Sequence, residues 1–328
     1  MKVLITGGAG FVGTRLAREL LKNGKLADKT IEQLVLADLS LPPADLLGDR
    51  RLRAATGTLI GQCAELSKER FDVVFHLAAA VSAECEADFD LGLRSNLDTT
   101  RALLDALRTA GNVPRFVFSS SLAVFGSDPA LPMPAAIRDD TLPTPQSSYG
   151  VQKFICEQLV ADYTRKGFID GRNVRLMTVV VRPGRPNGAA SGFMSGIIRE
   201  PVSGQASICP VAPETRVALA SPARTIEGLI AVAEAPWEAL GGRTAINLPA
   251  LTVSVGEMLQ ALEAAAGPEV RALVTFKQDA TIARLVGGWP AAFDNSRARR
   301  LGLEPDPDFI SIVRQYLDDR ARESASRS

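Results

Sequence analysis

The chain has 328 residues, 46% of them hydrophobic and 23% charged, so it can build a large core and is neither disordered nor fibrous. Its 37 basic and 37 acidic side chains cancel, so no net charge attracts nucleic acid or an anionic membrane, and we expect a small-molecule partner. No apolar run approaches the roughly 20 residues of a membrane span and no signal peptide is visible, so we expect a cytoplasmic protein.

Short apolar strands alternate with amphipathic helices through the first half of the chain. Strands that are apolar throughout are typical of parallel sheets covered on both faces, and the alternation predicts an α/β fold, a Rossmann-type doubly wound parallel sheet. The predicted strands are Lys2–Thr6, Leu34–Ala37, one that ends before Gly57, Asp72–Leu77, Arg115–Ser119 and Val174–Val181. The predicted helices are Val12–Asn23, Ala64–Arg70, Phe89–Ala110 and Ser148–Lys166.

A glycine-rich turn follows the first strand, with Gly7, Gly10 and Gly13 in a G-x-x-G-x-x-G pattern. Gly7 permits the tight turn, Gly10 lets the backbone approach a pyrophosphate, and Gly13 lets the helix pack on the strand. Phe11 and Val12 then present free backbone N–H groups to the anion. Although such glycines can form a merely tight turn, their place between strand and helix predicts a dinucleotide site.

Asp38 ends the second strand, about 25 residues after the last glycine of the turn. A carboxylate there accepts hydrogen bonds from both adenosine ribose hydroxyls and repels a 2′-phosphate, which favours NAD over NADP. The alternative is a helix-capping or turn aspartate. Thr58 and Leu59 follow the third strand, where we expect the adenine, although threonine stands where an aspartate is often found.

The chain contains a single histidine, His76, and four cysteines, none of which form a CxxC pair. A histidine-rich metal site is thereby excluded, and we expect neither a metal nor a disulfide framework. Ser-His-Asp catalysis would have only one candidate base. We expect His76 to be structural, and acid/base work to fall to other residues.

Ser121, Tyr149 and Lys153 are the candidate catalytic residues. Tyr149 and Lys153 are four residues apart, so they share one face of a helix. A phenol is a weak base at neutral pH, but a nearby ammonium and the positive nicotinamide ring of oxidised NAD favour the phenolate. Tyr149 would then be the base, Ser121 at the end of its strand would hold the substrate oxygen, and Lys153 would also reach the nicotinamide ribose.

The regular alternation stops after residue 188, where shorter elements separated by Pro and Gly begin. We predict an NAD-binding Rossmann domain over residues 1–182, with a return near 216–247, and a smaller C-terminal α/β substrate domain formed mainly by residues 183–328. Helices are predicted at Phe193–Arg199, Pro222–Ala233, Ser254–Ala266, Asp279–Val286 and Pro307–Ala321.

Together, the glycine turn, Asp38, Ser121 and the Tyr149/Lys153 pair resemble the extended branch of the short-chain dehydrogenase/reductase superfamily, which contains NAD-dependent epimerases and dehydratases. The resemblance covers essentially the whole chain. It implies NAD as cofactor and a homodimer paired through the helices at 89–110 and 148–166.

The resemblance also implies roles for residues between these motifs. Leu77, Ala78 and Ala79 belong to an H-x-A-A segment that lines the cofactor diphosphate and nicotinamide ribose. Asn96 counts among the catalytic and cofactor-binding residues and holds the active-site backbone. Arg182 and Pro183 begin an R-P-G segment that closes the nicotinamide pocket.

Four further stretches resemble one bacterial group within that branch, the D-erythronate dehydrogenases: Val81–Gly92, Tyr163–Arg172, Val181–Phe193 and Ile198–Pro201. This implies NAD-dependent oxidation of the C2 hydroxyl of a small sugar acid to a 2-oxo acid. The sequence departs from the group at Met177, where proline is expected, and at Ala218, where tryptophan is expected. The alternatives are a nucleoside-diphosphate-sugar epimerase that keeps NAD bound and a non-catalytic NAD-binding regulator.

A sugar-acid substrate needs a counter-charge for its carboxylate and hydrogen-bond partners for its hydroxyls. Arg182, Arg185 and Arg216 are candidates for the charge, although each arginine could instead serve a structural or surface ion pair. The candidate substrate-binding residues are Ser82, Ser121, Tyr149, Arg182, Asn187, Ser191 and Arg216.

Overall fold

A parallel sheet forms the centre of the computed structural model, which describes residues 1–184 and 191–325. Its strand order is β12-β8-β7-β6-β1-β4-β5, and every neighbouring pair is parallel. The order runs outward from β1 in both directions, which confirms the predicted doubly wound α/β fold. The strands are β1 (Lys2–Thr6), β4 (Gln33–Asp38), β5 (Leu52–Thr56), β6 (Val73–His76), β7 (Arg115–Ser121), β8 (Asp170–Leu176) and β12 (Ile246–Asn247).

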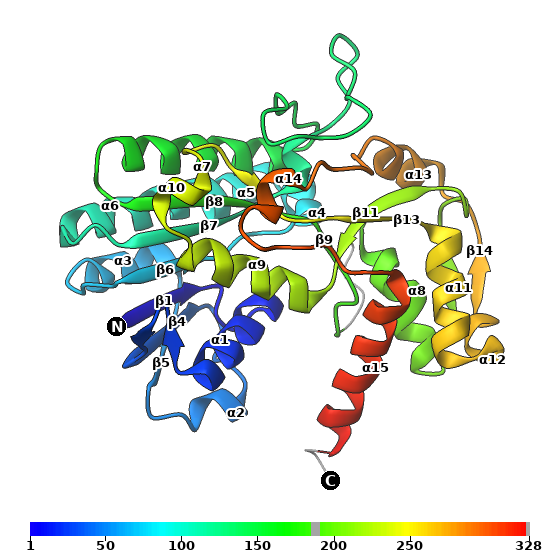
Figure 1. The fold of residues 1–328 in the computed structure, drawn as a ribbon, viewed down its shortest axis with the longest axis horizontal. Helices are drawn as coiled ribbons and strands as arrows, with labels where there is room; N and C mark the ends of the chain where they lie inside the picture. Colours follow the sequence, from blue (N-terminus) through cyan, green and yellow to red (C-terminus); the bar gives the residue numbers. More distant parts are fainter. Residues whose placement is uncertain (185–190, 326–328) are drawn as a thin grey trace.

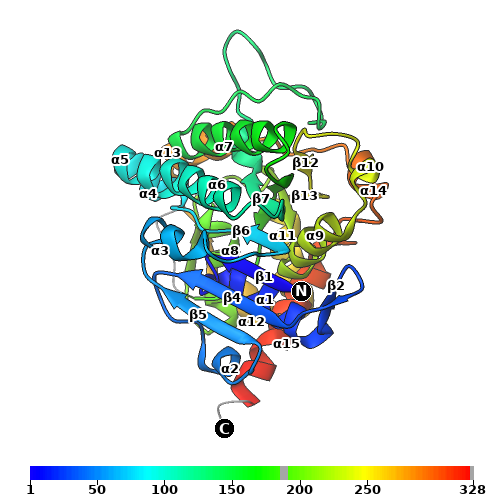
Figure 2. The ribbon, with the colours of Figure 1, turned by 90° about the vertical axis from the view of Figure 1, so that its left-hand side faces the viewer.

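Helices cover both faces of this sheet, as Figure 2 shows. On one face Leu4 of β1 packs with Leu104 and Val160 in one buried cluster, and on the other Ile5 packs with Leu20 and Leu229. This alternation explains why the strands are apolar throughout. The first face carries α3 (Leu59–Leu66), α6 (Thr99–Ala110) and α7 (Ser148–Arg165), and the second carries α1 (Phe11–Asn23), α9 (Pro222–Glu234) and α10 (Trp237–Leu240).

Two predicted element bounds are wrong. The helix predicted at Ala64–Arg70 is α3, Leu59–Leu66, because the Thr58 hydroxyl accepts a hydrogen bond from Gly61 N at 3.2 Å and so caps an earlier first turn. The strand predicted at Val174–Val181 is broken at Met177. It divides into β8 of the central sheet and β9 (Thr178–Val179), which pairs with a strand of a second sheet.

The helix predicted at Phe89–Ala110 is continuous, but its hydrogen-bonding pattern changes from α to π and back to α along its length. It consists of α5 (Phe89–Gly92), a π-helical segment, Leu93–Asp98, and α6. Asn96 lies in the π-helical segment, which is a frequent position for functional residues. A short helix, α4 (Ser82–Ala87), precedes it.

The C-terminal elements form a second core beside the sheet (Figure 1). Val217, Met258 and Phe309 are among its buried side chains. The chain also returns to the central sheet, because α9 packs on it and β12 extends it beside β8. The added strands are β10 (Ser207–Cys209), β11 (Arg216–Ala220), β13 (Leu251–Ser254) and β14 (Val274–Phe276). The added helices are α8 (Gly192–Val202), α11 (Val255–Ala266), α12 (Pro268–Arg271), α13 (Ala280–Gly287), α14 (Ser296–Arg299) and α15 (Phe309–Ala325).

Three small elements complete the described secondary structure: a hairpin of β2 (Lys25–Leu26) and β3 (Lys29–Thr30), α2 (Ala44–Leu47), and a 3₁₀ turn at Leu122–Val124. In the described part of the chain, no helix is long and apolar enough to span a membrane. Within the same residues, no group of three or more His, Cys, Asp or Glu side chains could hold a metal ion.

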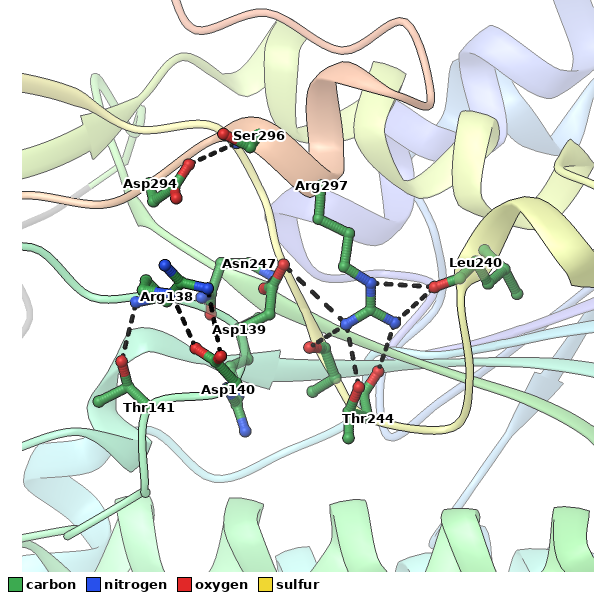
Figure 3. Close-up of polar contacts among 12 residues, drawn as sticks. Arg138, Asp139, Asp140, Thr141, Leu240, Thr244, Asn247, Asp294, Ser296 and Arg297 are labelled. Carbon is green, nitrogen blue, oxygen red and sulfur yellow. Dashed lines mark hydrogen bonds and ion pairs between the residues drawn. The ribbon is translucent and has the colours of Figure 1, made fainter.

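A long excursion, residues 125–147, links the strand of Ser121 to the helix of Tyr149 and projects from the top of Figure 1. It is anchored by Asp139, whose Oδ1 accepts from Asn247 N at 2.6 Å and whose Oδ2 lies 3.9 Å from Arg297 Nη1 (Figure 3). Burial raises the pKa of Asp139. The excursion is therefore held by the end of β12 and by α14, in addition to the two elements that it links, the 3₁₀ turn and α7.

Candidate active site

The glycine turn has the geometry that a bound diphosphate needs. Gly7 has a positive φ of +69°, and a Cβ added at Gly13 would lie 2.1 Å from the Gly7 carbonyl oxygen. Helix α1 begins after Gly10 without a side-chain cap and without an acid in its first turn. Its first N–H groups, from Phe11 and Val12 onward, are thus left for an anion. A dinucleotide diphosphate fits this site.

Asp38 closes the same site at the end of β4. Its Oδ2 accepts from Ala9 N at 3.0 Å and its Oδ1 from Ser40 N at 3.2 Å. Asp38 therefore braces the glycine turn, and each oxygen keeps a second lone pair for a ribose hydroxyl. Exposed apolar side chains follow both strands, Leu39 directly after β4 and Ile60 in the first turn of α3 after β5, and they are candidates to contact an adenine ring.

His76 is a buried structural residue, as expected. Thr100 donates its hydroxyl hydrogen to the Asn96 carbonyl at 2.6 Å, so His76 Nε2, 2.9 Å from Thr100 Oγ1, must donate to it. His76 Nδ1 then accepts from Thr6 Oγ1 at 2.6 Å, and Thr6 accepts from Ala78 N at 3.3 Å. Burial, aided by the charge of Lys153, lowers the pKa of His76 to about 3. A neutral ring thus links the segment after β6 to the π-helical segment.

This burial predicts a specific acid sensitivity. An unfolded histidine titrates near 6.5 and His76 in the fold at about 3, so in this interval the unfolded chain binds a proton that the folded protein does not. The contribution of His76 to stability is therefore fully present above pH 6.5 and is lost as the pH falls, by at most about 1.4 kcal/mol per pH unit.

Urea unfolding of His76→Gln between about pH 7.5 and 4 should show a shallower acid loss of unfolding free energy than the wild type shows. Thr100→Val keeps the histidine and removes one of its partners, so it should keep the wild-type slope. Equal slopes for wild type and His76→Gln would contradict the prediction.

Ser121, Tyr149 and Lys153 come together at the carboxyl end of β7 and the start of α7. Gly150 allows this approach, because a Cβ there would lie 2.1 Å from the Ala123 carbonyl oxygen. Lys153 Nζ donates to the Ser119 carbonyl at 2.7 Å and lies 5.6 Å from the centre of the Tyr149 ring. The predicted trio is thus one cluster, with the ammonium beside the phenol.

Burial governs the acidity of this cluster. It raises the pKa of Tyr149 to about 12, while a hydrogen bond with Ser121 and the charge of Arg182 lower it. Burial also lowers the pKa of Lys153 to about 8, against the opposing influence of Cys156, Cys85 and Glu157. Tyr149 is therefore a phenol in the cofactor-free protein, and it needs added positive charge to act as a base.

Sequence reasoning missed Glu157, which stands behind the cluster. Its carboxylate is 2% exposed, accepts from Ser120 Oγ at 2.5 Å and pairs with Arg175 Nε and Nη2 at 2.9 and 2.8 Å. It joins α7, β7 and β8 directly behind Ser121 and Lys153. The available signal was its spacing, because Glu157 follows Lys153 by four residues on the same helix.

Sequence reasoning also missed Gln152, the neighbour of Lys153. Asn96 is 2% exposed, and its Nδ2 donates to Gln152 Oε1 at 2.7 Å while its Oδ1 accepts from Ala80 N at 2.8 Å. Asn96 therefore contacts both α7 and Ala80, the residue that follows Leu77–Ala79.

Arg182 brings a positive charge to Tyr149, and each group shifts the pKa of the other. Its backbone is fixed by Ser195 Oγ, which accepts from Arg182 N at 3.1 Å, and by Arg199 Nη1, which donates to its carbonyl at 2.9 Å. Its guanidinium forms no ion pair with any described residue, and its Nη2 lies 3.5 Å from Ser191 Oγ. Burial lowers the pKa of Arg182, so a partly desolvated cation faces the site without an anion.

Of the other predicted substrate residues, Ser191 is partly exposed and accepts from Arg182 Nη2. Ser82 begins α4 and is partly exposed, Arg216 is exposed on β11, and Arg185 and Asn187 lie outside the described residues. Pro183, also exposed, follows Arg182. Thr58 and Leu59 are the cap and first residue of α3.

The two departures from the expected pattern meet in space. Met177 and Ala218 belong to one buried cluster with Leu122, the residue after Ser121. A small cavity of about 10 Å³ is lined by Leu122 and Ala218 together with Arg216 and Trp289. Both departures therefore lie in the buried cluster that contains the residue after Ser121.

Comparison with known proteins gives concordant results. A profile of the NAD dependent epimerase/dehydratase family matches residues 3–216. The chain is 48% identical to a D-erythronate dehydrogenase of Cupriavidus necator over 97% of this chain and 98% of that protein. It is 41% identical to a D-erythronate dehydrogenase of Haemophilus influenzae over 97% of this chain and 99% of that protein. A solved structure described as a nucleoside-diphosphate-sugar epimerase from Agrobacterium tumefaciens has 43% identity and a TM-score of 0.90, covering 97% of this chain and 94% of that one.

Proposed function

Because the chain belongs to the NAD-dependent epimerase/dehydratase family, we propose that it oxidises the C2 hydroxyl of a small sugar acid, D-erythronate or a close analogue, to the 2-oxo acid. The observation that carries this proposal is the guanidinium of Arg182, which has no acidic partner among the described residues and whose charge acts on Tyr149. A partly buried cation without an anion is costly, and a substrate carboxylate would offset that cost. The names of the two bacterial relatives favour erythronate as that substrate.

Tyr149 is the proposed base. It takes the proton of the C2 hydroxyl while Ser121 donates a hydrogen bond to the same oxygen and holds it against the phenol. When bound, NAD supplies the acceptor for the hydride that leaves C2. Lys153 has a pKa of about 8 and is protonated at lower pH, so its ammonium stabilises the phenolate; it also reaches toward the nicotinamide ribose.

Arg182 fixes the direction of the substrate in this proposal. A carboxylate bound to its guanidinium places the adjacent C2, and not a carbon farther along the chain, beside Tyr149. Ser82, Ser191 and Arg216 are left for the remaining hydroxyls. The cofactor domain would comprise residues 1–182 with the return through α9 and β12, and the substrate domain mainly residues 183–328.

The test is a panel of four- to six-carbon aldonic acids with NAD or NADP, followed by the absorbance of the reduced nicotinamide. We expect stoichiometric reduction of added NAD with a 2-hydroxy acid. The competing function is epimerisation of a nucleotide sugar, which the description of the Agrobacterium structure favours. If UDP-sugars raise the melting temperature of the protein and sugar acids do not, the proposed sugar-acid dehydrogenase is wrong and the epimerase function is favoured instead.

Cofactor choice gives a second prediction, centred on Asp38. The wild type should prefer NAD, and Asp38→Ala should weaken NAD binding by about tenfold to a hundredfold, because it removes charged acceptors worth about 1.5–3 kcal/mol. Asp38→Asn is the matched control, since an amide oxygen can still accept from Ala9 N while the negative charge is gone. It should retain more NAD affinity than Asp38→Ala and accept NADP better than the wild type. A wild type that prefers NADP would refute the role of Asp38.

The homodimer is also part of the proposal. Val151 and Ile155 are one helical turn apart on α7 and expose 41% and 38% of their surface. Apolar side chains repeated on an outer helix face support pairing through α6 and α7. Light scattering coupled to size-exclusion chromatography should report twice the mass of one chain, and Ile155→Glu should lower the measured mass toward that of a single chain.

A further inference from the structure

The buried amide of Gln152 is not explained by packing alone. Gln152 lies on α7 between Tyr149 and Lys153 and is 1% exposed. Its Oε1 accepts from Asn96 Nδ2, but its Nε2 is buried without a hydrogen-bond partner among the described residues. Leaving such a buried donor unpaired destabilises the fold. An apolar side chain of the same length would avoid this cost, so the Oε1 contact must serve a purpose.

The contacts of Asn96 show what that purpose is. The backbone N–H of Ala80 requires an oxygen, so Asn96 Oδ1 must face Ala80, and they lie 2.8 Å apart. Asn96 Nδ2 is then turned toward α7, where Gln152 Oε1 is its nearest acceptor at 2.7 Å. The Ala80 carbonyl and Cys85 Sγ, both 3.3 Å from Nδ2, are the other acceptors. Gln152 thus accepts the shortest hydrogen bond of an Asn96 amide whose orientation the Ala80 N–H sets.

This bond joins the two halves of the proposed site. Ala80 ends the segment that begins at Leu77, and a Cβ added at Gly7 would lie 2.8 Å from Ala78 N, so the segment lies directly against the glycine turn. Gln152 is next to Lys153 on the catalytic helix. The backbone makes room for the amide, because a Cβ added at Gly92 would lie 2.6 Å from Gln152 Nε2.

We propose that Gln152 is a positioning residue which acts through Asn96 to hold the segment of residues 77–80 at the spacing from α7 that one bound NAD requires. The proposal rests on the proposed function for its catalytic consequence. Its effect on NAD binding is independent of which acid, if any, is oxidised.

The experiment is a double-mutant cycle read by NAD affinity in the absence of any substrate. Gln152→Met keeps the length of the side chain and removes the acceptor, and we expect it to raise the Kd for NAD about tenfold. Asn96→Leu should raise the Kd at least as much. If Gln152 acts through Asn96, the double variant binds NAD no more weakly than Asn96→Leu alone.

Two further variants separate positioning from mere stability. Gln152→Glu keeps an acceptor for Asn96 Nδ2 and should stay within about threefold of the wild-type Kd, a difference below 1 kcal/mol. Asn112→Leu is the matched control, because the Asn112 amide also has one hydrogen bond, to the Phe71 carbonyl, and one buried atom without a partner among the described residues, but lies at the other end of the strands. It should lower the melting temperature and leave the Kd unchanged.

Additive effects in the cycle, or a Gln152→Met variant that is less stable yet binds NAD normally, would overturn the proposal. If Gln152→Met does not fold, a tenfold loss of NAD affinity in Gln152→Glu would overturn it as well. Failure of every sugar acid as substrate would instead overturn the proposed function and leave this cycle intact. The kcat of the variants on an active acid then reports the catalytic consequence.

Discussion

Replacing Tyr149 by phenylalanine is expected to lower kcat at least about a hundredfold while leaving the Kd for NAD near its wild-type value. The ring and its packing remain, and only the oxygen that takes the substrate proton is lost. Because burial holds the pKa of Tyr149 at about 12 without cofactor, the wild-type rate should rise with pH as the phenolate forms. Tyr149→Phe should lose this rising limb.

Tyr163→Phe is the matched control for that experiment. Tyr163 lies on the same helix, and its hydroxyl donates to Asp105 Oδ1 at 2.7 Å, away from the cluster of Ser121 and Lys153. It should turn over at the wild-type rate with the wild-type pH profile. Near-normal turnover of Tyr149→Phe would remove this residue from the mechanism.

Replacing Arg182 by methionine is expected to raise the KM for the sugar acid about a hundredfold, with the KM for NAD changed less than about threefold. Methionine keeps most of the bulk and removes the charge. The size of the effect follows from the surroundings, because Arg182 is partly buried and has no acid as partner among the described residues. A substrate carboxylate would thus lose the partly desolvated counter-charge that Arg182 provides.

Arg216→Met distinguishes this cation from the second candidate. Arg216 is exposed on β11, so an ion pair there is screened by water and contributes about 1 kcal/mol or less. Its KM for the acid should rise less than tenfold. If Arg216→Met raises that KM more than Arg182→Met does, the carboxylate binds at Arg216 and the assignment of Arg182 is wrong.

The features predicted correctly from the sequence depend on short spacings. The glycine turn, Asp38 and the pair of Tyr149 and Lys153 each lie within one strand-turn-helix unit, and together they predicted a family that the comparisons confirm. The doubly wound fold and NAD as cofactor followed from the same units and are confirmed too. Helix α3 was placed too late, because its start depends on one capping bond of Thr58 that hydrophobic periodicity does not reveal.

The sequence by itself determined the alternation of strands and helices in the first half, the dinucleotide turn and the helix that carries Tyr149 and Lys153, because backbone periodicity and glycine conformation are local properties. Only the tertiary structure decided that Gln152 bonds to Asn96, 56 residues away, and that Met177 and Ala218 meet in one buried cluster. It alone decided that Arg182, of the candidate arginines described, faces Tyr149 without an acid. Such relations depend on which distant side chains burial brings together, and one-dimensional spacing carries no record of that.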